Sequence, residues 1–163
     1  LFLANMEHDA SLRRIHEVVE ANKDQPGIRW NGKVGQDVLA KAYADAGVWP
    51  YMTTFPEIHC ITALKVQAHG VVPVTVDDFA LSETVQFGEK LPGPMDDTLN
   101  QRKFIDRVIH LLKNPWPREK RLEMMRWARS KTWDSVIGAW ESRFLADLSK
   151  ASEAKVPATS LTS

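Results

Sequence analysis

The chain has 163 residues and a formal charge of zero, because 21 basic side chains balance 21 acidic ones. This length suits one domain or half of a two-domain enzyme. The charge balance lacks the basic excess that most nucleic-acid-binding proteins show, and no apolar run approaches the roughly 20 residues that a membrane span needs. The single cysteine excludes an intrachain disulfide and fits a reducing compartment, so we expect a cytoplasmic protein.

The first part of the chain alternates strand-like and helical segments. Apolar residues at three- and four-residue steps predict helices, and short β-branched or aromatic runs predict strands. Strands are predicted at 1–4, 28–31 and 48–52, and helices at 12–19 and 38–46. Because proline cannot donate to a sheet, Pro50 places the strand at 48–52 at a sheet edge or near its own end.

The middle of the chain continues this alternation. Apolar positions at helical spacing predict a helix at 61–68, and Gly70 is expected to end it in a left-handed conformation. The β-branched run at 71–76 predicts the next strand. Residues 86–98, which are rich in Gly, Pro and Asp, are predicted to form a loop.

The last part of the chain is helical in pattern. Helices are predicted at 99–113, 117–130 and 133–148, and Thr132 is a suitable N-cap for the last one. The small and polar tail at 149–163 is expected to be disordered. Together these patterns predict an α/β fold: a Rossmann-like parallel sheet flanked by helices, with additional C-terminal helices.

A group of reactive side chains lies between the strand at 48–52 and the helix at 61–68: Glu57, His59 and the only cysteine, Cys60. Cys60 as a nucleophile is one hypothesis, since a helix N-terminus lowers a thiol pKa. Adjacent residues diverge on a helix or a strand, however, so His59 is poorly placed to activate it. A metal site that adds His69 is also disfavoured, because the spacing matches no zinc pattern.

A third interpretation of the same loop is a phosphate-sugar site. A loop that leaves a strand and enters a helix offers free backbone N–H groups and the positive end of the helix dipole, which suit a diphosphate. The carboxylate of Glu57 could accept hydrogen bonds from sugar hydroxyls. The simpler alternative is that Glu57 only stabilises the start of its helix.

Two stretches of the chain resemble the carboxyl-terminal, donor-binding half of GT-B glycosyltransferases of the "glycosyl transferases group 1" type. The first reads GIRWNGKV, then LAKAYADAGVWPYMTTFPEIHCITALKVQAHGVVPVTVDDFALSETV. The second reads FIDRVIHLLKNPWPREKRLEMMRWARSKTWDSVIGAWESRF and is similar to the closing helices of that family. The matching positions are Gly32, Leu39, Tyr43, Ala44, Ala46, Pro56, Glu57, Ala68, Gly70, Pro73, Val74, Glu83, Trp133 and Trp140.

The resemblance implies a nucleotide-diphosphate sugar as donor substrate and a retaining transfer without a cofactor or an obligatory metal. In this family one glutamate contacts the transferred sugar and a second, eight positions later, contacts the ribose. The first corresponds to Glu57, and the second is replaced by Lys65. A lysine donates hydrogen bonds but cannot accept them from ribose hydroxyls, so the ribose contact departs from the family pattern.

The other donor-binding residues follow from the same resemblance. Cys60 stands at the position of the family's loop glycine, and His59 stands where an aromatic residue is common. Backbone amides at Cys60, Ile61 and Thr62 are expected to face the diphosphate. Lys33 and Val34 correspond to the loop that touches the base.

The resemblance also concerns what the sequence lacks. It covers residues 1–148, which we expect to be a partial donor-binding domain, whereas the basic pair for the diphosphate and the N-terminal acceptor-binding domain would precede Leu1. We therefore expect the chain alone to be inactive. An alternative function, suggested by Lys65, is a degenerate Rossmann-like binding or scaffolding module. A thiol hydrolase that uses Cys60 is a third hypothesis.

Overall fold

The computed structural model describes residues 10–153, so the strand predicted at 1–4 lies outside the described part of the chain. The chain divides into two compact units between residues 40 and 41. The first unit contains helix α2 (Ala10–Asn22), and helix α3 (Gln36–Asp45) spans the boundary. Both helices confirm the sequence predictions, because α2 covers 12–19 and α3 covers most of 38–46.

The strand predicted at 28–31 is wrong, because these residues form an irregular segment of the first unit. Ile28 is 48% exposed and Trp30 is 61% exposed. Gly27 (φ +89°) and Gly32 (φ +60°) flank the segment in left-handed conformations, which interrupt an extended chain at both ends. Residues of high β-propensity do not form a strand when they are neither paired with another strand nor buried.

The second unit is built on a parallel sheet of three strands in the order β1 (Val48–Tyr51), β2 (Val72–Val76) and β3 (Glu89–Leu91). All five residues of β2 are buried, as expected of a central strand covered on both faces. Strand β1 lies at the edge, where the missing N–H of Pro50 is tolerated. The predicted parallel sheet is therefore confirmed, although it is small.

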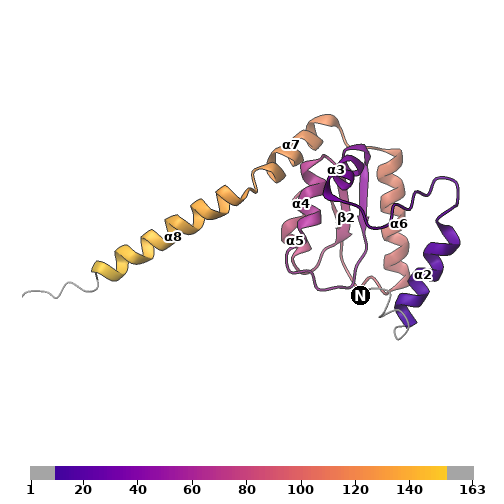
Figure 1. The fold of residues 1–163 in the computed structure, drawn as a ribbon, viewed down its shortest axis with the longest axis horizontal. Helices are drawn as coiled ribbons and strands as arrows, with labels where there is room; N and C mark the ends of the chain where they lie inside the picture. Colours follow the sequence, from indigo (N-terminus) through magenta and orange to yellow (C-terminus); the bar gives the residue numbers. More distant parts are fainter. Residues whose placement is uncertain (1–9, 154–163) are drawn as a thin grey trace, which may run out of the picture. The chain divides into compact units, whose positions relative to one another are not determined.

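Helices cover both faces of this sheet. Helices α4 (Ile61–Ala68) and α5 (Leu81–Thr84) lie on one side of β2, and α6 (Thr98–Lys113) lies on the other (Figure 1). Helix α7 (Arg118–Arg129) packs against α4. The buried core consists of Ala63, Val72, Val74, Val76, Leu81, Val85, Met95, Phe104, Leu111 and Met124.

The C-terminal end of α4 confirms the predicted role of Gly70. Gly70 has φ +81°, and its N–H donates to the carbonyl of Gln67 at 3.0 Å, while the N–H of Val71 donates to Val66 at 3.0 Å. This pair of bonds is the Schellman motif. The guanidinium of Arg121 in α7 donates to the carbonyl of Gly70 at 2.8 Å, so a cation also lies at the negative end of α4.

Strand β3 falls within 86–98, which the sequence analysis predicts as loop, so that prediction is wrong for Glu89–Leu91. Gly88, Pro92, Gly93 and Pro94 surround these three residues and dominate the local composition. Pairing with β2, in the register Val74↔Glu89, makes the segment a strand. This pairing depends on tertiary contacts that no local pattern reveals.

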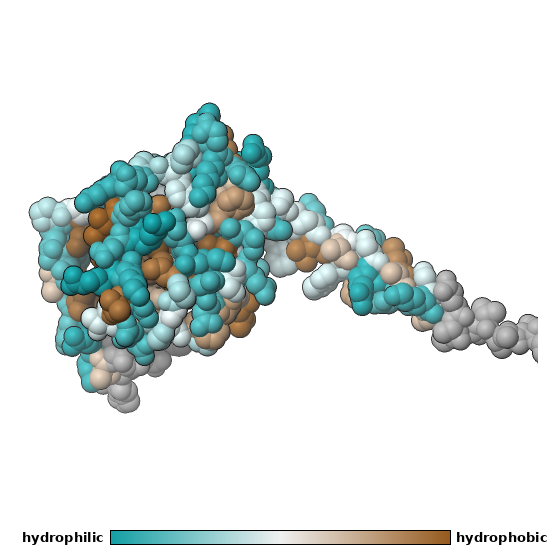
Figure 2. Space-filling model, turned by 180° about the vertical axis from the view of Figure 1, so that it is seen from behind, coloured by the Kyte–Doolittle hydropathy of each residue, from teal (hydrophilic) through white to brown (hydrophobic). Residues whose placement is uncertain are grey.

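Helix α8 (Trp133–Glu153) begins at the predicted N-cap. Thr132 and Ser135 exchange two hydrogen bonds of 3.2 Å, each from a backbone N–H to the other hydroxyl. The helix continues five residues beyond its predicted end at 148, because its composition stays helix-compatible up to Pro157. Its exposed large apolar side chains are Trp133, Val136, Ile137, Trp140, Phe144, Leu145 and Leu148. Figure 2 shows brown, hydrophobic patches along this helix.

Within residues 10–153, none of the helices combines the length and the apolar content that crossing a bilayer requires.

Candidate functional site

The candidate site lies at the edge of the sheet where its three strands end. Parallel strands bring their carboxyl ends to the same edge, and ligands of open α/β sheets bind there. The segments that follow β1, β2 and β3 at this edge are 52–60, 77–84 and 92–97. We call these three segments the carboxyl-end face.

Glu57 is held in this face by the last residue of β1. The hydroxyl of Tyr51 donates to Oε1 of Glu57 at 2.5 Å, and both side chains are partly buried. The ring of Tyr51 stacks on Trp49, with centroids 4.9 Å apart and planes inclined by 16°. The carboxylate is thus fixed by a short hydrogen bond from a supported aromatic ring, and its other oxygen can accept bonds from a ligand.

The Tyr51–Glu57 bond predicts a dependence of stability on alkaline pH. The bond to Glu57, with burial second, raises the pKa of Tyr51 above the usual value of 10.0. A raised folded-state pKa gives stability that is complete below about pH 10 and is lost as pH rises through the folded-state pKa. In denaturant titrations between about pH 9 and pH 12, the wild-type chain should lose more stability than Tyr51→Phe, and parallel losses would contradict the assignment.

The backbone at Cys60 has an unusual conformation for a residue with a side chain. Cys60 is the N-cap of α4 and adopts φ 52° and ψ 70°, the left-handed region that glycine occupies without strain. Its side chain makes no capping hydrogen bond, although N-caps normally supply an oxygen acceptor. Helix α4 therefore starts without a side-chain cap. The N–H of Ala63 donates to the carbonyl of Cys60 at 2.9 Å, and an anion could bind the N–H groups that precede it.

The strain at Cys60 gives a prediction about stability. Cys60→Ala removes the sulfur and keeps the left-handed backbone, whereas Cys60→Gly removes both the sulfur and the strain. The glycine variant should be more stable than the alanine variant by about 1 kcal/mol, which reverses the usual order of these residues in helices. Urea denaturation of the two variants measures this difference. A more stable alanine variant would show that the left-handed backbone carries no strain.

Hydrogen bonds fasten the loop at 52–60 to the segment at 77–84. The N–H of Ala80 donates to the carbonyl of Glu57 at 3.0 Å, and the hydroxyl of Thr84 donates to the carbonyl of His59 at 2.7 Å. Phe79 in the second segment has φ 49°, so it is also left-handed. Backbone strain of this kind is concentrated at binding sites, so the two left-handed residues make the carboxyl-end face a candidate site.

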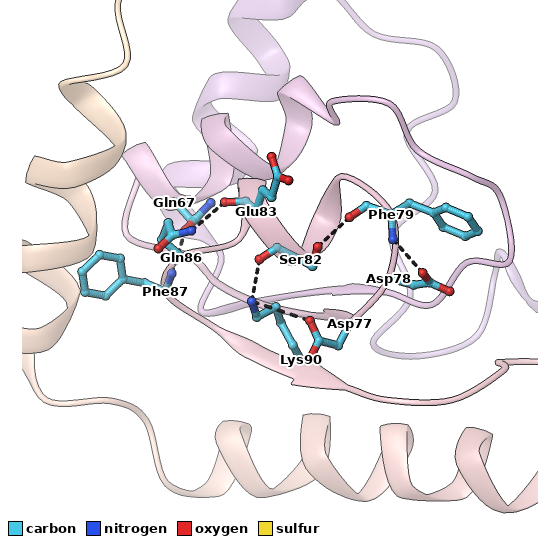
Figure 3. A network of polar contacts seen from close by, with 9 residues as sticks. All are labelled: Gln67, Asp77, Asp78, Phe79, Ser82, Glu83, Gln86, Phe87 and Lys90. Atoms are coloured by element: carbon cyan, nitrogen blue, oxygen red, sulfur yellow. Dashed lines mark hydrogen bonds and ion pairs between the residues drawn. The ribbon is translucent and has the colours of Figure 1, made fainter.

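The segment at 77–84 has further support of its own. Figure 3 shows Lys90, in β3, donating to the carbonyl of Ser82 at 2.7 Å, with its Nζ 3.7 Å from Oδ1 of Asp77. The N–H of Phe79 donates to Oδ1 of Asp78 at 2.8 Å, and the Phe79 ring points away from this network. The loop backbone is therefore well fixed while an apolar ring is left open to solvent.

The structure brings together most of the site residues that the sequence predicts. Glu57, His59, Cys60, Ile61 and Thr62 lie in sequence along the loop and the first turn of α4. Lys65 is exposed in the last turn of the same helix. Lys33, which is exposed, and Val34, which is partly buried, precede α3 in the first unit. Their part in a common site therefore stays a prediction.

Some site residues were not found by sequence reasoning. Tyr51 was assigned only to a strand, although a tyrosine at the last position of β1 faces the loop that follows. Phe79 was assigned no role, and the only signal for its turn was the pair Asp77-Asp78 directly after a strand. Gln67 was overlooked in an apolar helix, where a buried amide indicates an anchoring role.

The chemistry of the thiol does not favour a nucleophile. Burial raises the pKa of the Cys60 thiol above its usual value, and the nearby N–H groups of Ala63 and Thr62 do not reverse this. A raised pKa reduces the thiolate fraction on which nucleophilic attack depends. Among the described residues, no three His, Cys, Asp or Glu side chains lie close enough to hold a metal ion.

A groove of about 840 Å³ opens beside the loop, between α4–α5 and the junction of α7 with α8. His59, Ile61 and Glu83 line one side of it, and Trp127 and Trp133 line the other. Glu57 is not among its lining residues. The groove thus adjoins the candidate site without containing its carboxylate.

Comparison with known proteins found no matching family model, no matching curated protein and no matching solved structure.

Proposed function

We propose that the loop at 57–62 binds the diphosphate-sugar part of a nucleotide-diphosphate sugar, and that the chain is the donor-binding part of a retaining glycosyltransferase. The observation that carries the proposal is the left-handed conformation of Cys60. It occurs three residues after Glu57, at the position where the family that the sequence resembles has its loop glycine. Cys60 therefore adopts the left-handed backbone conformation that a glycine at this position would adopt.

The start of α4 and the side chain of Glu57 would bind different parts of the donor. The uncapped start of α4 offers N–H groups and the positive end of the helix dipole to the diphosphate. The same groups would stabilise the negative charge that develops on the diphosphate as it leaves. Glu57, held by Tyr51, would accept hydrogen bonds from hydroxyls of the transferred sugar.

The charges of the site determine how tightly it could bind a donor. The carboxyl-end face contains no lysine or arginine within 52–60, 77–84 or 92–97. A diphosphate would therefore rely on backbone N–H groups alone, so we expect weak binding by the isolated chain. Lys65 could donate to a ribose oxygen but cannot replace the acceptor of a second glutamate. Transfer would also require an acceptor-binding domain beside this one.

Saturation-transfer NMR tests the proposal, because it detects weak binding from the ligand side. UDP-, GDP- and ADP-glucose are mixed separately with the wild-type chain, with Glu57→Gln and with Glu123→Gln, an exposed position on α7. We expect saturation of sugar and base protons of at least one donor, reduced by Glu57→Gln and retained in Glu123→Gln. Equal signals from both variants, or no signal from any donor, would refute the donor site.

The absence of cations on this face also favours a second candidate function, a Rossmann-like binding module without transferase activity. In that case Glu57→Gln would leave the cellular role of the protein unchanged.

A further inference from the structure

Large apolar side chains project from the carboxyl-end face into solvent. Ile58 is 94% exposed, Phe55 is 63% exposed and Phe79 is 48% exposed. Met52, the first residue of the loop at 52–60, and Ile61, which directly follows the loop, are also exposed. Clusters of this kind on a folded surface mark interaction sites, because exposed apolar area is normally scattered.

These side chains are carried by an ordered backbone. The N–H of Glu57 donates to the carbonyl of Phe55 at 2.9 Å, and the N–H of Phe55 donates to the hydroxyl of Thr53 at 2.9 Å. The Ala80–Glu57 bond places the loop that carries Ile58 beside the segment that carries Phe79. A fixed apolar cluster binds a partner with little loss of conformational entropy.

The conformation of Phe79 supports the same conclusion. Its left-handed backbone is unfavourable for a bulky residue, and Phe79 is still 48% exposed. The hydroxyl of Ser82 donates to its carbonyl at 2.7 Å, which helps to hold the turn. Strain that presents an apolar ring to solvent is explained if that ring is an anchor for a partner.

The segments that carry the apolar cluster are rich in acidic residues and contain no lysine or arginine. The carboxyl-end face carries Glu57, Asp77, Asp78, Glu83, Asp96 and Asp97. Lys90, in β3, lies next to Asp77, with its Nζ 3.7 Å from Oδ1. A chain of zero net charge therefore has one face whose three segments contain six carboxylates and no lysine or arginine.

We propose that the carboxyl-end face docks a protein surface that presents lysine and arginine side chains around an apolar pocket. Charge complementarity selects this partner, because like charges facing each other destabilise a complex. A second copy of the same face would bring carboxylate against carboxylate. An anionic membrane surface would repel the face for the same reason. The proposal does not rest on the donor site, because it uses the exposed side chains of Ile58 and Phe79, whereas the donor site uses Glu57 and backbone N–H groups.

A pair of fluorescent model peptides tests this docking surface on the full 163-residue chain. One is an amphipathic peptide of leucine and lysine, and the other has glutamate at each lysine position. In fluorescence anisotropy titrations the lysine peptide should bind, more weakly as salt rises, and the glutamate peptide should not. Ile58→Ser and Phe79→Asn should each weaken binding about tenfold. Asparagine at 79 tolerates the left-handed backbone.

Leu148→Ser, which removes a 66% exposed apolar side chain from α8, is the control and should change the affinity less than about twofold. Thermal melts should show that all variants remain folded, because neither Ile58 nor Leu148 is buried. The proposal is overturned if both peptides bind equally, if only Leu148→Ser weakens binding, or if phosphatidylserine vesicles bind in a manner that depends on Ile58.

Discussion

Replacing Gln67 by leucine should lower the free energy of unfolding by about 3 kcal/mol. The amide of Gln67 is completely buried in α4. Its Nε2 donates to the carbonyls of Ala63 at 2.8 Å and Thr84 at 2.9 Å, and its Oε1 accepts the N–H of Phe87 at 3.2 Å. Leucine has a similar size, but it would leave the buried carbonyl of Thr84 and the partly buried N–H of Phe87 without these partners, which is the source of the destabilisation.

Gln86→Leu is the matched control, since Gln86 is exposed and its amide bonds only to the carbonyl of Glu83 at 2.8 Å (Figure 3). Its stability should stay within about 0.5 kcal/mol of the wild-type value. Urea denaturation followed by circular dichroism compares the two variants. Equal effects of the two substitutions would mean that Gln67 does not join α4 to the segment before β3.

Gly88→Ala should also lower the free energy of unfolding by about 3 kcal/mol, for a steric reason. A Cβ at position 88 would lie 2.7 Å from the carbonyl oxygen of Pro73 and 2.9 Å from Cγ1 of Val85. The oxygen belongs to the backbone of the central strand, so it cannot move aside as a flexible side chain could. The φ of +152° adds strain for any residue with a Cβ.

Gly138→Ala provides the comparison, because a Cβ at position 138 in α8 would meet nothing within 4 Å. Alanine is the better helix former, so this variant should match or exceed the wild-type stability. Thermal unfolding of the two alanine variants tests the prediction. A Gly88→Ala variant as stable as Gly138→Ala would show that β3 can shift away from β2 without loss.

The elements that sequence reasoning located correctly are those with local signals. Helix α4 was predicted at 61–68, the bounds that the structure shows, because its apolar spacing and the glycine at position 70 are both local features. The start of α8 was found through the cap residue Thr132. The strand predicted at 28–31 does not form, and β3 forms where a loop is predicted. In both cases, pairing with a neighbouring strand, which local signals do not show, decides whether a short segment becomes a strand.

The candidate site also has a part that local sequence signals predict and a part that they do not. Glu57 and the start of α4 could be singled out because a strand, a loop and a helix follow each other in the sequence. The bond from Tyr51 to Glu57 and the left-handed turn at Phe79 depend on how the segments after β1 and β2 meet in space. No local pattern contains that information. The donor and its sugar remain predictions that rest on the resemblance.

The most direct test of the proposed donor site is a nitrogen-15 NMR titration of the 163-residue chain with nucleotide-diphosphate sugars of different bases. Backbone amides report where a ligand binds, even when binding is weak. The proposed site predicts that at least one donor shifts the amides of residues 57–62, and that Glu57→Gln reduces these shifts while Glu123→Gln does not. Amide shifts confined to other segments, or unchanged spectra with every donor, would contradict it.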